Sequence, residues 1–372
     1  MVEFWRAGGS ERTTSIEAAR RIEAEGWDGQ MFMDSQSLAA DPCVMMGAWA
    51  VATERLKLST GVTNPLTRHP AVIATAAATV QSISGGRAVL GIGRGDSALA
   101  YLGHAPASLA SFRQALYDLQ TLLSGGEVAF GSDGAIADAP SIDTMSLGGR
   151  PTATRLQWLP EGMPKVPLDV AATGPKVIAM SAPLAERLTF SVGAIPERIR
   201  WAIEIAREAR KRQNLTDAGV SYGAQIIVAC HPDLEAVRQT ATTMVAPLAR
   251  FQVIQGDAAG PQSDNDAENF AAIQRGYDMT KHAMVLSEDR VKGATLTWDF
   301  VQRFAIVGSP SHCTERLLQL VALGVERFVI VGPGYHPEAR NSGPGLFVSE
   351  VMPAVRRAIE QRSRLCEKSA DC

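Results

Sequence analysis

Long hydrophobic runs and an excess of charge of either sign are both missing from this sequence. Its 372 residues are 46% hydrophobic and 20% charged. Charged or turn-forming residues interrupt every apolar stretch before the roughly 18 residues that a membrane-spanning helix needs. The 36 basic and 39 acidic residues are scattered, so the basic stripe typical of a nucleic-acid-binding protein is absent. We therefore expect a soluble protein with no nucleic-acid partner and no membrane partner.

Metal-binding and hydrolase motifs are absent as well. The five cysteines show no Cys-x-x-Cys, the six histidines show no His-Glu-x-x-His, and no Gly-x-Ser-x-Gly occurs. These absences argue against a metal site and against an α/β-hydrolase nucleophile. An odd number of dispersed cysteines is typical of a reducing compartment. The amino terminus has a glutamate at position 3 and lacks the basic and apolar regions of a signal peptide, so we expect a cytoplasmic protein.

What the sequence does have is a regular alternation of short apolar stretches and amphipathic stretches. Helices are expected between strands that lie near the amino terminus and at 30–34, 56–64, 87–93, 168–173, 188–192, 221–230 and 327–331. Strands this apolar predict a parallel sheet covered by helices, and eight of them favour closure into a (β/α)8 TIM barrel of the α/β class. A doubly wound open sheet is the alternative.

A barrel needs about 250 residues, so roughly a hundred residues remain. We assign them to two insertions in a single domain that spans residues 1–372. The first, at about 124–166, follows the fourth strand and helix and is rich in glycine and proline. The second, at about 251–304, precedes the last strand and is polar and acidic. Loops of this length are typically lids or disordered segments.

The residues expected at the carboxyl ends of the strands are mostly glycine and small polar residues. The run 91–96 ends in Asp96, where a dinucleotide-binding fingerprint needs a small residue, so the match is poor. We expect instead a turn in which at least one glycine has positive φ. The segment 171–176 ends a strand and begins a helix at Pro175, and free N–H groups there would form an anion site. A capped helix end without a ligand explains this spacing equally well.

Two stretches, 60–74 and 83–96, together resemble a known family. The first reads Thr-Gly-Val-Thr-Asn-Pro-Leu-Thr-Arg-His-Pro-Ala-Val-Ile-Ala, and the second reads Ile-Ser-Gly-Gly-Arg-Ala-Val-Leu-Gly-Ile-Gly-Arg-Gly-Asp. With the segments 171–176, 307–310 and 323–332, the chain is similar to the luciferase-like flavin and deazaflavin oxidoreductases. Within that family it looks most like the branch of methylenetetrahydromethanopterin reductase and of the dehydrogenases that use coenzyme F420. The resemblance covers nearly the whole chain except the two insertions.

The resemblance implies a luciferase-like TIM barrel and a set of cofactor contacts. It implies a non-proline cis peptide, here Gly61–Val62, in a bulge of the third strand behind the ring of the cofactor. The contacts to the ring and its polar edge map onto Asp34, Gly61, Val62, Thr63, Asn64, Gly95 and Asp96. The contacts to the phosphate map onto Ala172, Thr173, Gly174 and Pro175, in agreement with the anion site. By the same analogy the protein would form a homodimer.

One position departs from the family pattern. Dehydrogenase members have Asp-His at the end of the second strand, where the histidine assists proton transfer, whereas this chain has Asp34-Ser35. Asp34 and Asp96 are then the candidate catalytic residues, with Asp96 as the acid. A plain hydrogen-bonding role for Asp96 is the alternative. Hydride transfer to an already electrophilic carbon, which needs little acid–base help, fits the departure better than a histidine-assisted oxidation.

Three functions are compatible with the resemblance. The first is a coenzyme F420-dependent oxidoreductase that transfers a hydride between the reduced deazaflavin and a small organic substrate. The second is a two-component monooxygenase that uses reduced FMN and oxygen, and the third is a flavin or metabolite binder without catalysis. The anionic tail of F420 needs basic groups at the mouth of the barrel, where the carboxyl ends of the strands lie. Candidates for these groups are Arg68, Arg94 and Lys176. A separate flavin or F420 reductase is a candidate partner.

Overall fold

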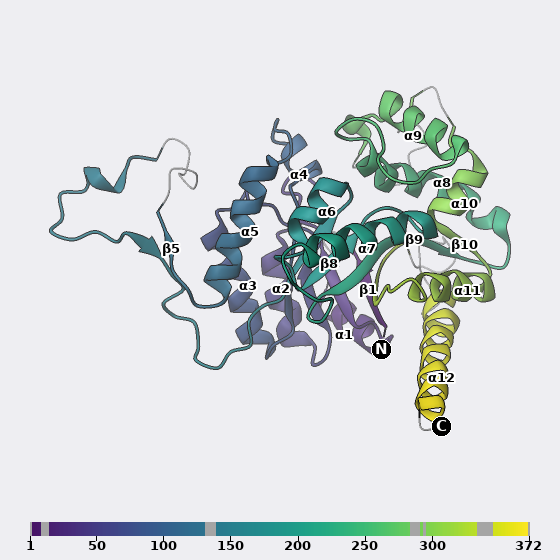
Figure 1. The fold of residues 1–372 in the computed structure, drawn as a ribbon, viewed down its shortest axis with the longest axis horizontal. Helices are drawn as coiled ribbons and strands as arrows, with labels where there is room; N and C mark the ends of the chain where they lie inside the picture. The colour runs from purple at the N-terminus through teal and green to yellow at the C-terminus, as the bar shows by residue number, and fades with distance from the viewer. Residues whose placement is uncertain are drawn as a thin grey trace.

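The structure is a computed structural model that describes residues 2–8, 15–130, 139–282, 291–292, 295–332 and 345–370, with residues 365–370 described as backbone only. At its centre eight parallel strands form a barrel (Figure 1). In chain order they are Glu3–Ala7 (β1), Gly29–Phe32 (β2), Lys57–Thr60 (β3), Ala88–Ile92 (β4), Leu168–Ala172 (β7), Arg187–Phe190 (β8), Ser221–Cys230 (β9) and Arg327–Val331 (β11).

The order of the strands shows that the barrel is closed. Each of the eight strands pairs in parallel with the next one along the chain, β8 pairs with β9, and β11 pairs back onto β1. The TIM-barrel prediction is therefore confirmed, and the open-sheet alternative is wrong. All residues of β2 and β4 are buried, because side chains on one face fill the barrel and those on the other meet helices. A further short strand, Ile306–Gly308 (β10), pairs with the last three residues of β9 and is not predicted by the sequence pattern.

Helices surround the strands (Figure 1). They are Ile16–Ala24 (α1), Pro42–Ala52 (α2), Pro70–Ser84 (α3), Ser97–Ala100 (α4), Leu109–Leu123 (α5), Pro175–Ser181 (α6), Pro196–Lys211 (α7), Leu234–Ala249 (α8), Asp264–Gly276 (α9), Trp298–Phe304 (α10), Pro310–Val321 (α11) and Met352–Ala370 (α12). Proline occupies the first position of α2, α3, α6, α7 and α11. An N–H at this position has no acceptor within the helix, so its absence in proline costs no helical hydrogen bond. Among the described residues, no helix has the length and apolar character needed to cross a membrane.

The first insertion leaves the barrel after α5 and projects from it as an extended arm (Figure 1). Its regular structure is a two-stranded antiparallel sheet of Val128–Ala129 (β5) and Ala153–Thr154 (β6), with a 3-10 turn at Ile142–Thr144. Most residues from 139 to 164 are exposed, so the described part of the arm contributes little to the core.

The second insertion differs from the expectation of a lid or disordered loop. Its described part contains α9 and α10, and these helices bury Phe270, Phe300 and Phe304 in a second apolar cluster. The cluster also includes side chains of α8 and of the carboxyl ends of β9 and β10. This part of 251–304 is therefore helical and packs against the barrel, because its apolar residues recur at helical spacing between the charged ones.

Candidate functional site

The carboxyl end of β3 differs from a regular strand. After Thr60 the Gly61–Val62 peptide is cis, as the family resemblance predicts. Thr63 then returns to the sheet, where its N–H donates to the carbonyl oxygen of Gly91 at 3.0 Å and forms an isolated bridge with Ile92. A side chain at Gly91 would collide with the Thr60 carbonyl oxygen, so the close approach of β3 and β4 requires glycine there. The third strand is consequently shorter than the predicted 56–64.

Three buried polar atoms at this turn have no hydrogen-bond partner among the described residues. They are Thr63 Oγ1, Asn64 Nδ2 and Thr67 Oγ1. Asn64 is held in one orientation, because its Oδ1 accepts the backbone N–H groups of Leu66 at 3.1 Å and Thr67 at 3.0 Å. Its Nδ2 is therefore left as a donor. Buried polar atoms without partners are costly in native proteins, and a ligand that fills the site would satisfy them.

Asp34 is buried at the end of β2 and is already engaged. Its carboxylate accepts Gln36 Nε2 at 2.5 Å and lies 3.4 Å from Arg68 Nε. Arg68 also pairs with Asp41, with 2.7 Å between Nη2 and Oδ2. Although burial lowers it, hydrogen bonds to Asp41 and Asp34 raise the pKa of Arg68. Two carboxylates thus balance the Arg68 charge, so Arg68 is a poorer candidate than Arg94 or Lys176 for binding the anionic tail of F420.

Asp96 forms an ion pair that the sequence pattern does not reveal. Its Oδ2 accepts Arg250 Nη2, and the Arg250 guanidinium lies 4.4 Å from the ring centre of Phe251 and 5.5 Å from that of Tyr277. Gly95 has a φ of 83°, as expected for a turn in this run. The hydrogen-bonding alternative for Asp96 is therefore present in the structure, while its role as an acid stays a prediction.

Ser35, in place of the family histidine, pairs with another hydroxyl. Its Oγ lies 2.9 Å from Ser97 Oγ, in the first turn of α4 directly after Asp96. The loops after β2 and β4 are thus joined at the mouth by two serine side chains. Both hydroxyls can donate or accept a hydrogen bond, but neither is a base at neutral pH.

The predicted phosphate segment lies at the carboxyl end of β7. Ala172 is buried, whereas Thr173, Gly174 and Pro175 are partly exposed. Helix α6 begins after Gly174 without a side-chain cap, and a Cβ on Gly174 would have no atom within 4 Å. The backbone at this end is open on the side that a ligand would occupy. The structure thus brings an open helix start to the mouth, and phosphate binding stays a prediction.

The two other basic candidates differ in their surroundings. Arg94 Nε donates to the Ala107 carbonyl oxygen at 2.6 Å and Nη1 to Gln255 Oε1 at 2.9 Å, so its contacts are neutral groups. Burial lowers the pKa of Arg94. Lys176 is exposed at the start of α6.

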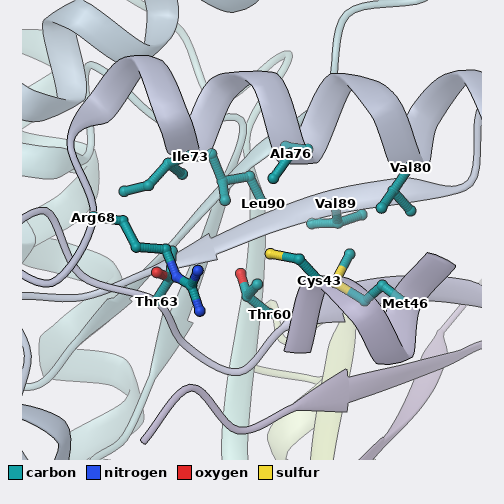
Figure 2. Close-up of a pocket in the computed structure, with 11 residues that line it drawn as sticks. Cys43, Met46, Thr60, Thr63, Arg68, Ile73, Ala76, Val80, Val89 and Leu90 are labelled. Atoms are coloured by element: carbon teal, nitrogen blue, oxygen red, sulfur yellow. The ribbon is translucent and has the colours of Figure 1, made fainter. Parts of the chain in front are cut away.

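A hollow on the helix side of the barrel wall adjoins the turn after β3, because Thr63 and Arg68 line it (Figure 2). It lies between helices α2 and α3 and strands β3 and β4. Its lining is mostly apolar and consists of Cys43, Met46, Thr60, Thr63, Arg68, Ile73, Ala76, Ala77, Val80, Val89 and Leu90. Its polar side chains, Thr60, Thr63 and Arg68, come from the end of β3 and the turn that follows it. Among the described residues, no three histidine, cysteine or carboxylate side chains gather as metal ligands would.

Sequence reasoning missed the partners that insertion residues bring to the mouth. Arg250 and Gln255 belong to the end of α8 and the start of the second insertion, and Tyr101 Oη donates to the Met279 carbonyl oxygen at 3.0 Å. No local motif marks these residues. Thr67, in contrast, lies within the family stretch and could have been found by its position.

Comparison with known proteins places the fold and site in context. The model of the family described as luciferase-like monooxygenase matches residues 5–327. The 5,10-methylenetetrahydromethanopterin reductase of Methanolobus tindarius is 24% identical over 322 residues, covering 85% of this chain and 89% of the relative. The F420-dependent glucose-6-phosphate dehydrogenase of Beutenbergia cavernae is 35% identical over 335 residues, covering 86% and 84%.

Solved structures share the architecture. The coenzyme F420-dependent tetrahydromethanopterin reductase from Methanopyrus kandleri is similar with a TM-score of 0.68 and 21% identity, covering 95% of this chain and 99% of that one. The oxygenating constituent of 3,6-diketocamphane monooxygenase from Pseudomonas putida, solved with FMN, has a TM-score of 0.64 and 18% identity, covering 95% and 99%. At these identities the likeness concerns the fold alone.

Proposed function

The chain belongs to the luciferase-like monooxygenase family and is an oxidoreductase, and on this premise we propose that it uses coenzyme F420. The proposed reaction transfers a hydride between the reduced deazaflavin and a small organic substrate. The observation that carries the proposal is the set of unpartnered buried atoms at the end of β3, Thr63 Oγ1, Asn64 Nδ2 and Thr67 Oγ1. The choice of F420 is supported by the sequence relatives that are named F420-dependent glucose-6-phosphate dehydrogenase.

The residues present fit a polar-edged ring at the mouth. When bound, the deazaflavin would supply the hydride-carrying carbon. Thr63 and Asn64 would hydrogen-bond the polar edge, and Gly61, Val62 and Gly95 would allow the backbone to approach the ring. The fixed amide of Asn64 orients this contact, because only its Nδ2 is left to donate.

The phosphate would lie at the start of α6. Ala172, Thr173, Gly174 and Pro175 surround a helix start that has no side-chain cap, where backbone N–H groups and the helix dipole favour an anion. Arg94 and Lys176 are the basic groups left for an anionic tail, because the charge of Arg68 is balanced by Asp34 and Asp41.

The proposed substrate is a compound with an already electrophilic carbon, such as a carbonyl, imine or enone. Neither Ser35 nor Ser97 can act as a base in place of the family histidine, but each hydroxyl can hydrogen-bond an acceptor on a substrate. Asp34 and Asp96 remain the proposed acidic groups. Each of them is paired with an arginine, which favours a positioning role.

A fluorescence-quenching titration of the purified protein against F420 and FMN, oxidised and reduced, tests this proposal. Tighter binding of F420 is expected. Tighter binding of FMN, followed by oxygen consumption with the reduced cofactor, would instead favour the two-component monooxygenase with a separate reductase. Binding without turnover of any electrophilic substrate would favour a flavin or metabolite binder.

We further propose that a second copy of the chain covers helices α2 and α3. Their outward faces carry Val44 and Val51, which are 71% and 72% exposed, and Val72 and Ile83, which are 54% and 49% exposed. Residues seven or eleven positions apart share one helix face, so each helix presents an apolar strip. Apolar strips of this kind are typical of protein interfaces.

The homodimer has a direct test. The variant V44D/V51D should elute as a monomer in size-exclusion chromatography with light scattering, whereas Leu234→Asp, at an exposed apolar position on α8, should leave the dimer intact. A monomeric unmodified protein would contradict the proposal. We also propose a cytoplasmic location, which the free thiols of Cys43, Cys230 and Cys313 support.

A further inference from the structure

Two cysteines meet where β9 ends and α11 begins. Cys230 is the last residue of β9 and lies opposite Gly308 of β10 in the parallel register. Cys313 is the fourth residue of α11, which begins shortly after β10. Its thiol donates to the Gly308 carbonyl oxygen, with 3.5 Å between Sγ and O. Gly308 thus lies beside both cysteines.

Both cysteines adjoin Gly308, but they differ in exposure. A hydrogen bond with Cys230, together with burial, raises the pKa of the Cys313 thiol. Cys313 is fully buried, whereas Cys230 is partly exposed, and both are free thiols. A dissolved reagent can thus reach Cys230 first, while Cys313 is shielded and already beside it.

We propose that Cys230 and Cys313 form a reversible redox pair, in which a peroxide oxidises the two thiols to a disulfide that fastens β9 to α11. In the first step the Cys230 thiol loses its proton and its sulfur attacks a peroxide oxygen, so that the O–O bond breaks and a sulfenic acid forms. With hydrogen peroxide, the hydroxide that leaves takes up the thiol proton and becomes water. In the second step the Cys313 sulfur, on losing its proton, attacks the Cys230 sulfur, the S–O bond breaks and a second water leaves. Two thiols are oxidised and one peroxide is reduced.

Because both cysteines adjoin Gly308, a small movement of their side chains would bring the sulfur atoms to the bonding distance of about 2.05 Å. The bond would close a loop from residue 230 to residue 313, which contains α8, α9 and α10 and also Arg250, the partner of Asp96. A crosslink over so long a loop restricts the unfolded chain, so the oxidised protein should melt at a higher temperature.

The test uses the full chain with Cys43→Ser, Cys366→Ser and Cys372→Ser, which leaves only the proposed pair. After hydrogen peroxide is added to the native protein, both thiols should be lost together and the intact mass should fall by two hydrogens. Peptide mapping should show residues 230 and 313 linked. The melting temperature should rise, and dithiothreitol should reverse all of these changes.

A matched variant separates the two roles. With Cys313→Ser added, Cys230 should still be oxidised and its sulfenic acid should be trapped by dimedone, but no crosslink should form. Oxidation of Cys230 alone in the presence of Cys313, or survival of both thiols under peroxide, would overturn the proposal. Should Cys313→Ser not fold, mapping of the crosslink in the unsubstituted chain decides the matter, because a pairing with any other cysteine also contradicts it.

Discussion

The two ends of the barrel bury polar groups of different kinds. At the carboxyl end, Thr63, Asn64 and Thr67 each keep a buried polar atom without a partner among the described residues. At the amino end, Asp169 and Arg327 are equally buried but face each other, with 3.1 Å between Oδ2 and Nη2. The charges at the amino end are paired within the chain, although Asp169 Oδ2 and Arg327 Nε form no hydrogen bond with a described residue. At the carboxyl end, Thr63, Asn64 and Thr67 are uncharged, and no ion pair within the described part of the chain compensates for their missing hydrogen bonds.

Glu3 belongs to the same balanced group at the amino end. Its carboxylate accepts Lys57 Nζ at 2.5 Å, Arg187 Nη2 at 2.7 Å and Trp5 Nε1 at 2.8 Å. Although burial raises it, the Arg187 charge and the hydrogen bonds from Lys57 and Trp5 lower the pKa of Glu3 to about 2. The contrast agrees with other TIM barrels, in which the amino end contributes to stability and the carboxyl end holds the active site.

The largest expected effect comes from breaking the balance at the amino end. Arg327→Met leaves Asp169 buried without its main counterion and should lower the free energy of unfolding by about 3–5 kcal/mol. Urea denaturation followed by circular dichroism measures this change. The double variant R327M/D169L should recover part of the loss, because no unpaired charge remains. A single variant as stable as the unsubstituted chain would show that the Asp169–Arg327 pair does not carry the stability of this end.

The pH dependence of stability should report on Glu3. Because its pKa in the folded protein is about 2, below its ordinary value of 4.5, its contribution is fully present above pH 4.5 and is lost as the pH falls toward 2. The loss should amount to about 3 kcal/mol. In Glu3→Gln the free energy of unfolding should vary less between these pH values. An unchanged acid limb in that variant would assign the pH dependence to other carboxylates.

Substitutions at the carboxyl end should lower the affinity for the cofactor without lowering the stability of the protein. Thr63→Val removes a buried hydroxyl that has no partner, so stability of the free protein should stay equal or rise slightly. Affinity for F420 should fall by about tenfold, since one hydrogen bond to the ring is lost. Asn64→Ala is the companion variant for the ring contact. A destabilised Thr63→Val protein with unchanged affinity would contradict the proposed site.

The smallest change concerns the start of α6. A Cβ at Gly174 meets no other atom, so Gly174→Ala should leave both stability and F420 affinity nearly unchanged. Gly174→Phe would fill the open space and should weaken F420 binding by about tenfold or more, without loss of stability. Isothermal titration calorimetry with F420 measures the affinities of the two variants. Equal affinities for the two variants would remove the phosphate from this segment.

Much of the architecture was accessible from the sequence alone. The alternation of apolar and amphipathic stretches predicts all eight barrel strands. The regularity of a βα repeat explains this success, because each unit repeats the same local pattern. The second insertion was harder to predict, because its charged and polar residues suggest an exposed loop, whereas α9 and α10 are stabilised by the apolar cluster around Phe270.

The family motif likewise located the mouth but not its internal contacts. Gly61–Val62, Thr63 and Asn64 lie where the resemblance places them, at the end of β3. The pairing of Asp96 with Arg250 joins residues 154 positions apart, and the contact between Ser35 and Ser97 joins residues 62 apart. A sequence pattern within one segment cannot reveal contacts between residues so far apart along the chain.

The sequence by itself determined the barrel, the order of its elements and the glycine-rich, small polar character of its mouth, because these depend on local periodicity and on residue type. Only the tertiary structure decided which polar atoms are satisfied. Whether a buried hydroxyl or charge finds a partner depends on which strands and loops the closed barrel brings together. That is why the ion pairs of the amino end, the unpartnered polar atoms of the carboxyl end and the approach of Cys230 and Cys313 to Gly308 are visible only in the folded chain.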